Sequence, residues 1–198
     1  MSKYIEQYPW LRLRSLYTGE LYEKIDAYDE ILEGWQTAFG EMLLKDLDTV
    51  IKTKNLQDEF VFEQVKEKFG QLVMYVNTAD QDVHRVLDKY YTLSANICAH
   101  CGKPDVSMLR MNWIIPLCED CYNKMNYRDG TPRKNAEPYE SITTEDNTMP
   151  DKMKTTRWTR TLLGENMTIE TEIDISKTAQ VIRENYEKRI DEKAKSDE

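Results

Sequence analysis

The 198-residue sequence has only two histidines and lacks the short motifs that most often mark catalysis. It contains no glycine-rich phosphate loop, no HExxH motif and no GxSxG nucleophile elbow. Its two histidines, His84 and His100, do not lie within a recognisable catalytic motif. We therefore expect a protein that works by binding and is not an enzyme.

Long apolar runs are also absent. None approaches the ~20 residues of a membrane-spanning helix. The N-terminal segment MSKYIEQYPWLRLRS has neither the apolar centre nor the small-residue cleavage site of a signal peptide. We therefore expect a cytoplasmic protein in a reducing compartment, where disulfides are rare.

Cysteine is scarce as well, but its placement is the most specific feature of the chain. The four cysteines form two CxxC pairs separated by sixteen residues: Cys98 and Cys101, then Cys118 and Cys121. Two disulfides, a redox pair or buried free thiols are the alternatives. A redox CxxC motif stands alone near a βαβ pattern, and disulfides need an oxidising compartment. The spacing therefore predicts one structural Zn²⁺ per chain, held by all four cysteines.

Four cysteine ligands also limit what the metal can do. A catalytic zinc has three protein ligands and an open position, whereas four thiolates fill the tetrahedral shell. His100 lies inside the first CxxC pair and could act as a fifth ligand or a proton carrier, but a surface position is the simpler interpretation. HNH-type nucleases share this kind of zinc module and need a general-base histidine on its hairpin, and residues 107–117 contain none.

The residues around the cysteines predict a compact module over 98–128. Residues 98–102 have the form of a zinc knuckle in which Gly102 takes a positive φ. Residues 107–117 predict a β-hairpin, and 118–125 predict the first turns of a short helix. Knuckle, hairpin and helix in this order are typical of a treble clef, and a zinc ribbon is the alternative.

The charge of the chain argues against a general nucleic-acid-binding protein, because the formal net charge is −9. Residues 98–134 are the exception, with six Lys and Arg against four Asp and Glu. These basic residues either balance the charge of the thiolates or form a phosphate-binding patch. The candidates for nucleic-acid binding are Arg110, Lys124, Arg128, Arg133 and Lys134.

Residues 1–97 predict a mainly helical core. Apolar residues recur at steps of three and four from 34 to 54, which predicts an amphipathic helix. Gly40 lies inside it and indicates close packing against another element. The stripe consists of Trp35, Phe39, Met42, Leu43, Leu47, Val50 and Ile51.

Three further elements follow in the predicted core, and one precedes them. Residues 59–69 predict a second helix that ends at Gly70 and buries Phe62, Val65 and Phe69. The apolar run at 71–76 predicts a buried strand, and 79–96 predicts a helix that leads directly to Cys98. Leu11 and Leu13 predict a short edge strand after Pro9, with Tyr17 as its farthest possible member.

The C-terminal third divides into a polar linker or long loop at 129–156 and a structured segment at 157–198. Strands are predicted at 157–163 and 167–175, followed by a helix with Ser176 as its N-cap. A hairpin and one helix are not stable alone, so they must dock on residues 1–125, on a second copy or on a partner. The predicted fold class is α+β: a helical core with a short strand, a four-cysteine zinc module packed on it, and a C-terminal hairpin plus helix.

Several segments resemble a group of small uncharacterised proteins of bacteriophages and prophages, chiefly from Gram-positive hosts. The likeness covers about residues 8–125. It is carried by 34–40, 65–72, 91–94, the two CxxC pairs with Gly102 and Trp113, and 116–118. Residues 71–75 depart from it, since relatives tend to have a glycine and an arginine before the aromatic residue. The resemblance implies a phage origin, hence host cytoplasm, and a zinc site.

The chain is rich in aromatic residues, with four Trp, twelve Tyr and four Phe. Tyr and Trp are enriched in the centres of protein interfaces. We therefore expect a non-enzymatic accessory protein that binds a host protein, a phage protein or a second copy of itself, and that inhibits a host function such as antiviral defence. A nucleic-acid-binding regulator that uses the zinc module is the alternative.

Overall fold

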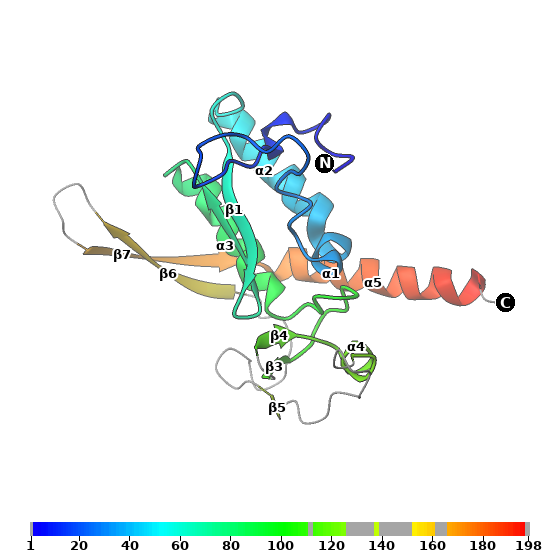
Figure 1. The fold of residues 1–198 in the computed structure, drawn as a ribbon. Coiled ribbons are helices and arrows are strands. Elements are labelled where there is room, and N and C mark those ends of the chain that lie inside the picture. The colour runs from blue at the N-terminus through cyan, green and yellow to red at the C-terminus, as the bar shows by residue number, and fades with distance from the viewer. Residues whose placement is uncertain (1, 111–112, 126–136, 139–151, 161–165, 197–198) are drawn as a thin grey trace.

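The computed structural model of the protein describes residues 2–110, 113–125, 137–138, 152–160 and 166–196. These residues form a mixed α/β fold with short antiparallel sheets, as the sequence predicts in outline. In Figure 1 the helices α2 and α3 lie beside β1 in the body of the molecule, and the segment around β3, β4 and α4 lies at one end of it. The fold can therefore be described as a body, a cysteine-bearing end and a C-terminal segment.

One helical run forms the centre of the body. It consists of α1 (Glu33–Trp35), the π-helical turn η2 (Gln36–Gly40) and α2 (Glu41–Thr53), so the predicted helix at 34–54 is confirmed. Its buried face includes Trp35, Phe39 and Leu47, which are at most 1% exposed. Close packing at Gly40 is also confirmed, because a Cβ there would collide with the hydroxyl of Tyr28.

The predicted helix at 59–69 is wrong. Residues there form strand β1 (Phe62–Lys68), which pairs antiparallel with β2 (Gln71–Val76), the strand predicted at 71–76. A β-bulge between Phe62 and Gln64 adds a residue, so Phe62 and Val65 are both buried although they are three positions apart. The spacing of buried residues in this bulged strand therefore resembles that of a helix.

The supposed end of that helix is the turn of the hairpin. Phe69 and Gly70 have φ values of 52° and 80°, and positive φ at both central residues is the mark of a type I′ turn. Phe69 is 67% exposed, where the helix prediction buried it. The same glycine is favoured by a helix C-terminus and by this turn, and the sequence pattern alone did not separate the two.

Helix α3 (Gln81–Ser94) packs against β2 and α2 and confirms the helix predicted at 79–96. Asp80 caps it, because its carboxylate accepts from the backbone N–H groups of Asp82 and Val83. Two bonds join α3 to α2: Lys89 Nζ and Tyr90 Oη both donate to a carboxylate oxygen of Asp46, at 2.8 and 2.7 Å. The helices and the β1–β2 hairpin therefore share one core.

The N-terminal segment wraps this core without forming the predicted edge strand. Pro9–Leu11 is a short 3-10 helix, η1, and single bridges join Leu13 to Phe62 and Arg14 to Leu21. Leu11 and Leu13 are buried as expected. The chain turns back on itself between Arg14 and Leu21.

The module that follows α3 has the predicted order of elements. Strand β3 (Met108–Arg110) pairs antiparallel with β4 (Ile114–Pro116), and the short helix α4 (Glu119–Asn123) comes next. A third strand, β5 (Glu137–Pro138), pairs with the other edge of β3. Part of the predicted linker therefore adds to this sheet, while residues 129–136 and 139–151 lie outside the described residues.

The C-terminal segment is a long hairpin followed by a helix. Strand β6 (Lys152–Arg160) pairs antiparallel with β7 (Asn166–Asp174), so the first strand begins five residues earlier than predicted. Helix α5 (Ser176–Ser196) follows. Ser176 is the first helical residue and not the N-cap: its N–H and hydroxyl donate to Asp174, and the carbonyl of Ile175 accepts from Ala179.

In Figure 1 the β6–β7 hairpin extends away from the body, and α5 runs past α1 in the opposite direction. We call this hairpin, residues 152–174, the arm. Helix α5 packs on η2 and buries Ala179 and Ile182, and Ile175 just before it is buried as well. Every helix among the described residues is too short or too polar to cross a membrane.

Candidate metal centre

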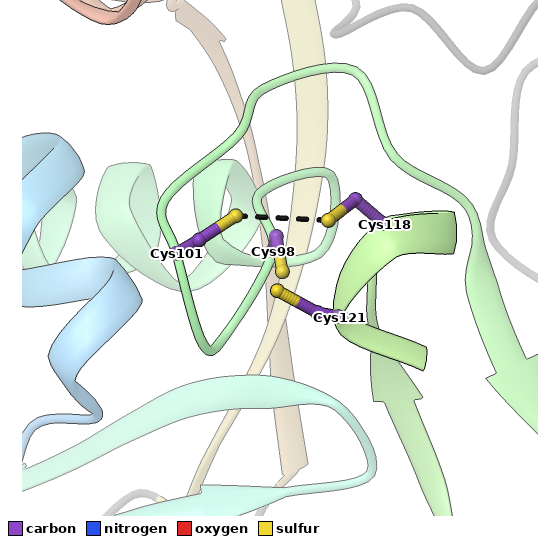
Figure 2. Close-up of side chains that lie close together, drawn as sticks. All are labelled: Cys98, Cys101, Cys118 and Cys121. Atoms are coloured by element: carbon purple, nitrogen blue, oxygen red, sulfur yellow. Dashed lines mark hydrogen bonds between the residues drawn. The ribbon is translucent and has the colours of Figure 1, made fainter. Parts of the chain in front are cut away.

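The four cysteines that the sequence selects come together in space. Cys98 and Cys101 lie on the loop after α3, Cys118 precedes α4, and Cys121 lies within α4. Figure 2 shows their sulfurs pointing toward a common centre. All four Sγ atoms lie within 4.8 Å of one another, and the Sγ atoms of Cys101 and Cys118 are 3.6 Å apart. This cluster can hold one metal ion.

Local hydrogen bonds shape the first half of the site. Gly102 N–H donates to the carbonyl of Cys98, and Cys98 N–H donates to the carbonyl of Lys103, at 2.9 and 2.8 Å. Gly102 has the predicted positive φ, 75°. The chain therefore makes a tight turn that offers two sulfurs to the same point.

The second half comes from the start of α4. Cys118 occupies the N-cap position with an extended backbone, and its carbonyl accepts from the N–H of Tyr122 at 2.9 Å. Cys121 follows one turn later. Cys98 and Cys118 are buried, whereas Cys101 and Cys121 lie nearer the surface.

The electrostatics of the cluster favour a bound cation. Burial opposes ionisation of Cys98, but backbone N–H groups of Cys118, Cys101 and His100 bond to it and hold its pKa below the usual thiol value. Burial and the neighbouring charge of Cys98 raise the pKa of Cys101 to about 11. Burial and the adjacent sulfurs raise the pKa of Cys121 further. Four thiolates this close repel one another unless a metal ion compensates their charge.

Hydrogen bonds join the central helix to the backbone of the knuckle and of the residue before it. Gly34 N–H donates to the carbonyl of Ala99, and Trp35 Nε1 donates to the carbonyl of Ile97, each at 3.0 Å. A Cβ on Gly34 would collide with the carbonyl of Cys98, and a Cβ on Gly102 would lie 2.6 Å from the carbonyl oxygen of Gly34. Two glycines far apart in the sequence therefore let the helix and the knuckle touch.

Helix α5 braces the same module. Arg183 Nε and Nη2 donate to the two carboxylate oxygens of Asp105, at 2.8 and 2.9 Å. Burial, and next the charges of Cys101 and Cys118, raise the pKa of Tyr186 on the same helix. The sequence did not predict the contact between Arg183 and Asp105, because nothing in the local pattern links positions 78 residues apart.

Of the residues considered for nucleic-acid binding, the structure describes the side chain of Lys124. Lys124 is exposed just after α4, and Arg110 ends β3. Arg128, Arg133 and Lys134 lie outside the described residues. A basic patch built from this set therefore stays a prediction.

Neither histidine belongs to the metal cluster. His100 is exposed, and His84 Nε2 lies 2.8 Å from the carbonyl oxygen of Thr78. Among the described residues, the cluster of ligand atoms that could hold a metal consists of the four cysteines alone.

Comparisons with protein-family models, curated proteins and solved structures each found no match. Function is therefore inferred from the metal centre and the exposed surfaces.

Proposed function

We propose that the four cysteines hold one structural Zn²⁺. Thiolates at the corners of a tetrahedron, about 2.3 Å from zinc, are about 3.8 Å from one another. The 3.6 Å between the sulfurs of Cys101 and Cys118 is close to that spacing. An all-cysteine shell suits zinc among the divalent metals, and it leaves no open position for substrate.

We further propose that the chain is a non-enzymatic phage or prophage accessory protein that binds a host or phage protein and inhibits a host function such as antiviral defence. The observation that supports protein binding is the arm, which extends away from the body in Figure 1. Each of its two strands has one edge that the other strand does not use. Backbone groups on such edges recruit further strands from partner proteins.

The charges of the arm favour a different protein over a second copy. Strand β6 has four basic and no acidic residues, whereas β7 has three acidic and no basic residues. The register pairs Lys152 with Asp174 and Lys154 with Glu172. A symmetric dimer through two β6 edges or two β7 edges would therefore place like charges together, which opposes self-pairing.

The metal centre has a structural part in this proposal. Helix α5 continues directly from β7, and the Arg183–Asp105 ion pair fixes α5 to the loop after the knuckle. Zinc would hold that loop in place. The metal would thus support the platform that carries the arm, without contacting the partner.

Affinity capture from infected Gram-positive host cells tests the proposal. The bait is the full chain, and the matched control replaces residues 152–174 with a short Gly/Ser linker. We expect the full chain to enrich a host or phage protein that the armless chain loses, while both chains melt at similar temperatures. Identical protein sets from both baits, or none above background, would contradict the proposal.

A further inference from the structure

The cysteine cluster contains a pair of sulfurs that lie close enough for covalent chemistry. The Sγ atoms of Cys101 and Cys118 are 3.6 Å apart, and Figure 2 marks this contact with a dashed line. The two residues belong to different CxxC pairs, one on the knuckle and one at the start of α4. A cysteine that is oxidised to a sulfenic acid condenses with a nearby thiol to give a disulfide. The geometry thus offers a pair for reversible oxidation.

The two members of this pair differ in accessibility. Cys101 is the most exposed of the four cysteines, whereas Cys118 is 5% exposed. Accessible thiolates beside a second cysteine are the usual targets of peroxide. Cys101 is therefore the residue that a peroxide in solution meets first, and Cys118 needs only to reach Cys101.

A bound metal would keep both sulfurs ionised. A cysteine loses its proton when it binds zinc, so the ligands of a zinc centre are thiolates. The thiolate, and not the thiol, is the nucleophile. The metal-loaded centre therefore holds an accessible nucleophile at Cys101 and a second one, 3.6 Å away, at Cys118.

Oxidation of this pair would be transmitted to α5 along a short path. The N–H of Gly102 donates to the carbonyl of Cys98, and Asp105, three residues later, accepts both hydrogen bonds of Arg183. Asp105 has φ 55°, in the left-handed region that residues with a side chain seldom adopt. Such a conformation persists only while neighbouring contacts maintain it. Loss of the metal would therefore free the residue that holds α5.

We propose that Cys101 and Cys118 form a reversible oxidation site: a peroxide joins them in a disulfide, the metal leaves, and α5 with the arm is released from the module. The inference rests on the proposed function, because it assigns a regulation to the same metal centre. Oxidising conditions weaken the support of the arm, and a thiol reductant together with zinc restores it.

The reaction balances with one peroxide for each disulfide. The Cys101 thiolate attacks one oxygen of hydrogen peroxide, the O–O bond breaks and hydroxide leaves, which gives a sulfenic acid. The Cys118 thiolate then attacks the sulfur of Cys101, the S–O bond breaks and a second hydroxide leaves. The two sulfurs lose two electrons, and the peroxide gains them. Cys98 and Cys121 remain as thiolates, and two ligands are too few for the tetrahedral shell of a structural zinc.

Metal release with disulfide mapping tests the site on the purified full chain. Zinc is measured first, and hydrogen peroxide is then added in the presence of a chromogenic zinc chelator. We expect release of one zinc per chain, a disulfide between Cys101 and Cys118 in peptide mass spectra, and recovery of metal binding after treatment with a thiol reductant and zinc. A disulfide within one CxxC pair, or oxidation that cannot be reversed, would overturn the inference.

Two controls separate thiol oxidation from other effects. Diamide oxidises thiols and leaves the nine methionines of the chain unchanged, so it should release the same amount of zinc. Release by peroxide alone would contradict the disulfide. A chain without zinc before oxidation would overturn the proposed metal centre and this inference with it, whereas zinc that stays bound under both oxidants would overturn this inference alone.

Limited trypsin digestion tests the consequence for α5. Lys188 on α5 and Lys45 on α2 are both exposed lysines within helices. We expect cleavage after Lys188 to be on the order of 10-fold faster in the oxidised chain, with a much smaller change after Lys45. In Arg183→Gln the acceleration should be smaller, because the ion pair that oxidation releases is already absent. Equal acceleration at both lysines would show a general loss of the fold and would overturn the release of α5.

Discussion

Among the described residues, the cysteine module and the arm differ in the number of independent contacts that hold each of them. The module is fixed by four converging sulfurs, by the packing of Gly34 on the knuckle and by the Arg183–Asp105 ion pair. The arm is a ladder of two strands, with α5 continuing from its second strand. A region fixed by three kinds of contact can hardly change without loss of the fold, whereas a projecting hairpin can change its sequence at less cost to the fold.

Loss of a cysteine should have the largest effect on stability, because it acts on the region held by the most contacts. Cys118→Ser removes one thiolate, and because structural zinc supplies folding free energy, we expect a loss of several kcal/mol in stability. Metal analysis should fall from one zinc per chain to well below one, and the melting temperature should fall by more than about 10 °C. Cys101→Ser and Cys121→Ser should behave alike.

The matched control is His100→Ser, which changes a residue between Cys98 and Cys101. His100 is exposed and stands outside the sulfur cluster, so metal content and melting should stay as in the unaltered chain. A metal-free protein with normal melting would show that the module is stable without a bound metal.

Closing the space between helix and knuckle should have the next largest effect. Gly34→Ala places a methyl group against the carbonyl of Cys98 and the backbone of Ala99, neither of which can move easily. We expect a loss of about 2–4 kcal/mol in urea unfolding. Lys45→Ala, at an exposed position on α2, is the control and should change stability by less than about 0.5 kcal/mol. Equal stability of the two variants would mean that the module and the helix are less closely coupled than the contacts indicate.

Features with a dense local sequence pattern were predicted, whereas features set by a distant partner were not. The helix at 33–53, strand β2, helix α3 and the cysteine cluster were predicted because each has a dense local pattern: helical spacing, an apolar run or paired CxxC motifs. Strand β1 was mistaken for a helix because its bulge places Phe62 and Val65 on one side, as a helix would. Bulges are set by the partner strand, which a single stretch of sequence does not reveal.

Contacts between distant positions were also outside the reach of the sequence. The packing of Gly34 on Gly102 and the pairing of Arg183 with Asp105 depend on two surfaces meeting in the folded chain. No local pattern in the sequence links the two members of either pair. The sequence thus predicted the cysteine cluster and left unpredicted what the cysteine-bearing loops pack against.

Removal of the α5 ion pair should have a smaller effect. The side chains of Arg183 and Asp105 are 34% and 29% exposed, so solvent screens their attraction. A double-mutant cycle with Arg183→Gln and Asp105→Asn should give a coupling free energy of about 1 kcal/mol, favoured by the two parallel bonds. Limited proteolysis should cut α5 faster in both single variants. A coupling near zero would leave the apolar contacts of Ile175, Ala179 and Ile182 as what holds α5 to the body.

The smallest effect should come from Lys124, the candidate for nucleic-acid binding whose side chain the structure describes. Lys124 is exposed beside acidic Glu119 and Asp120 of α4, and the chain as a whole repels phosphate. Duplex DNA should therefore show no retardation by the protein at about 50 mM salt or at a few-fold lower ionic strength, and Lys124→Ala should change nothing. Binding that falls steeply with salt and weakens in Lys124→Ala would instead assign the module to nucleic acid. In that case the module would have both a structural role and a binding role. It would then no longer differ from the arm in this respect.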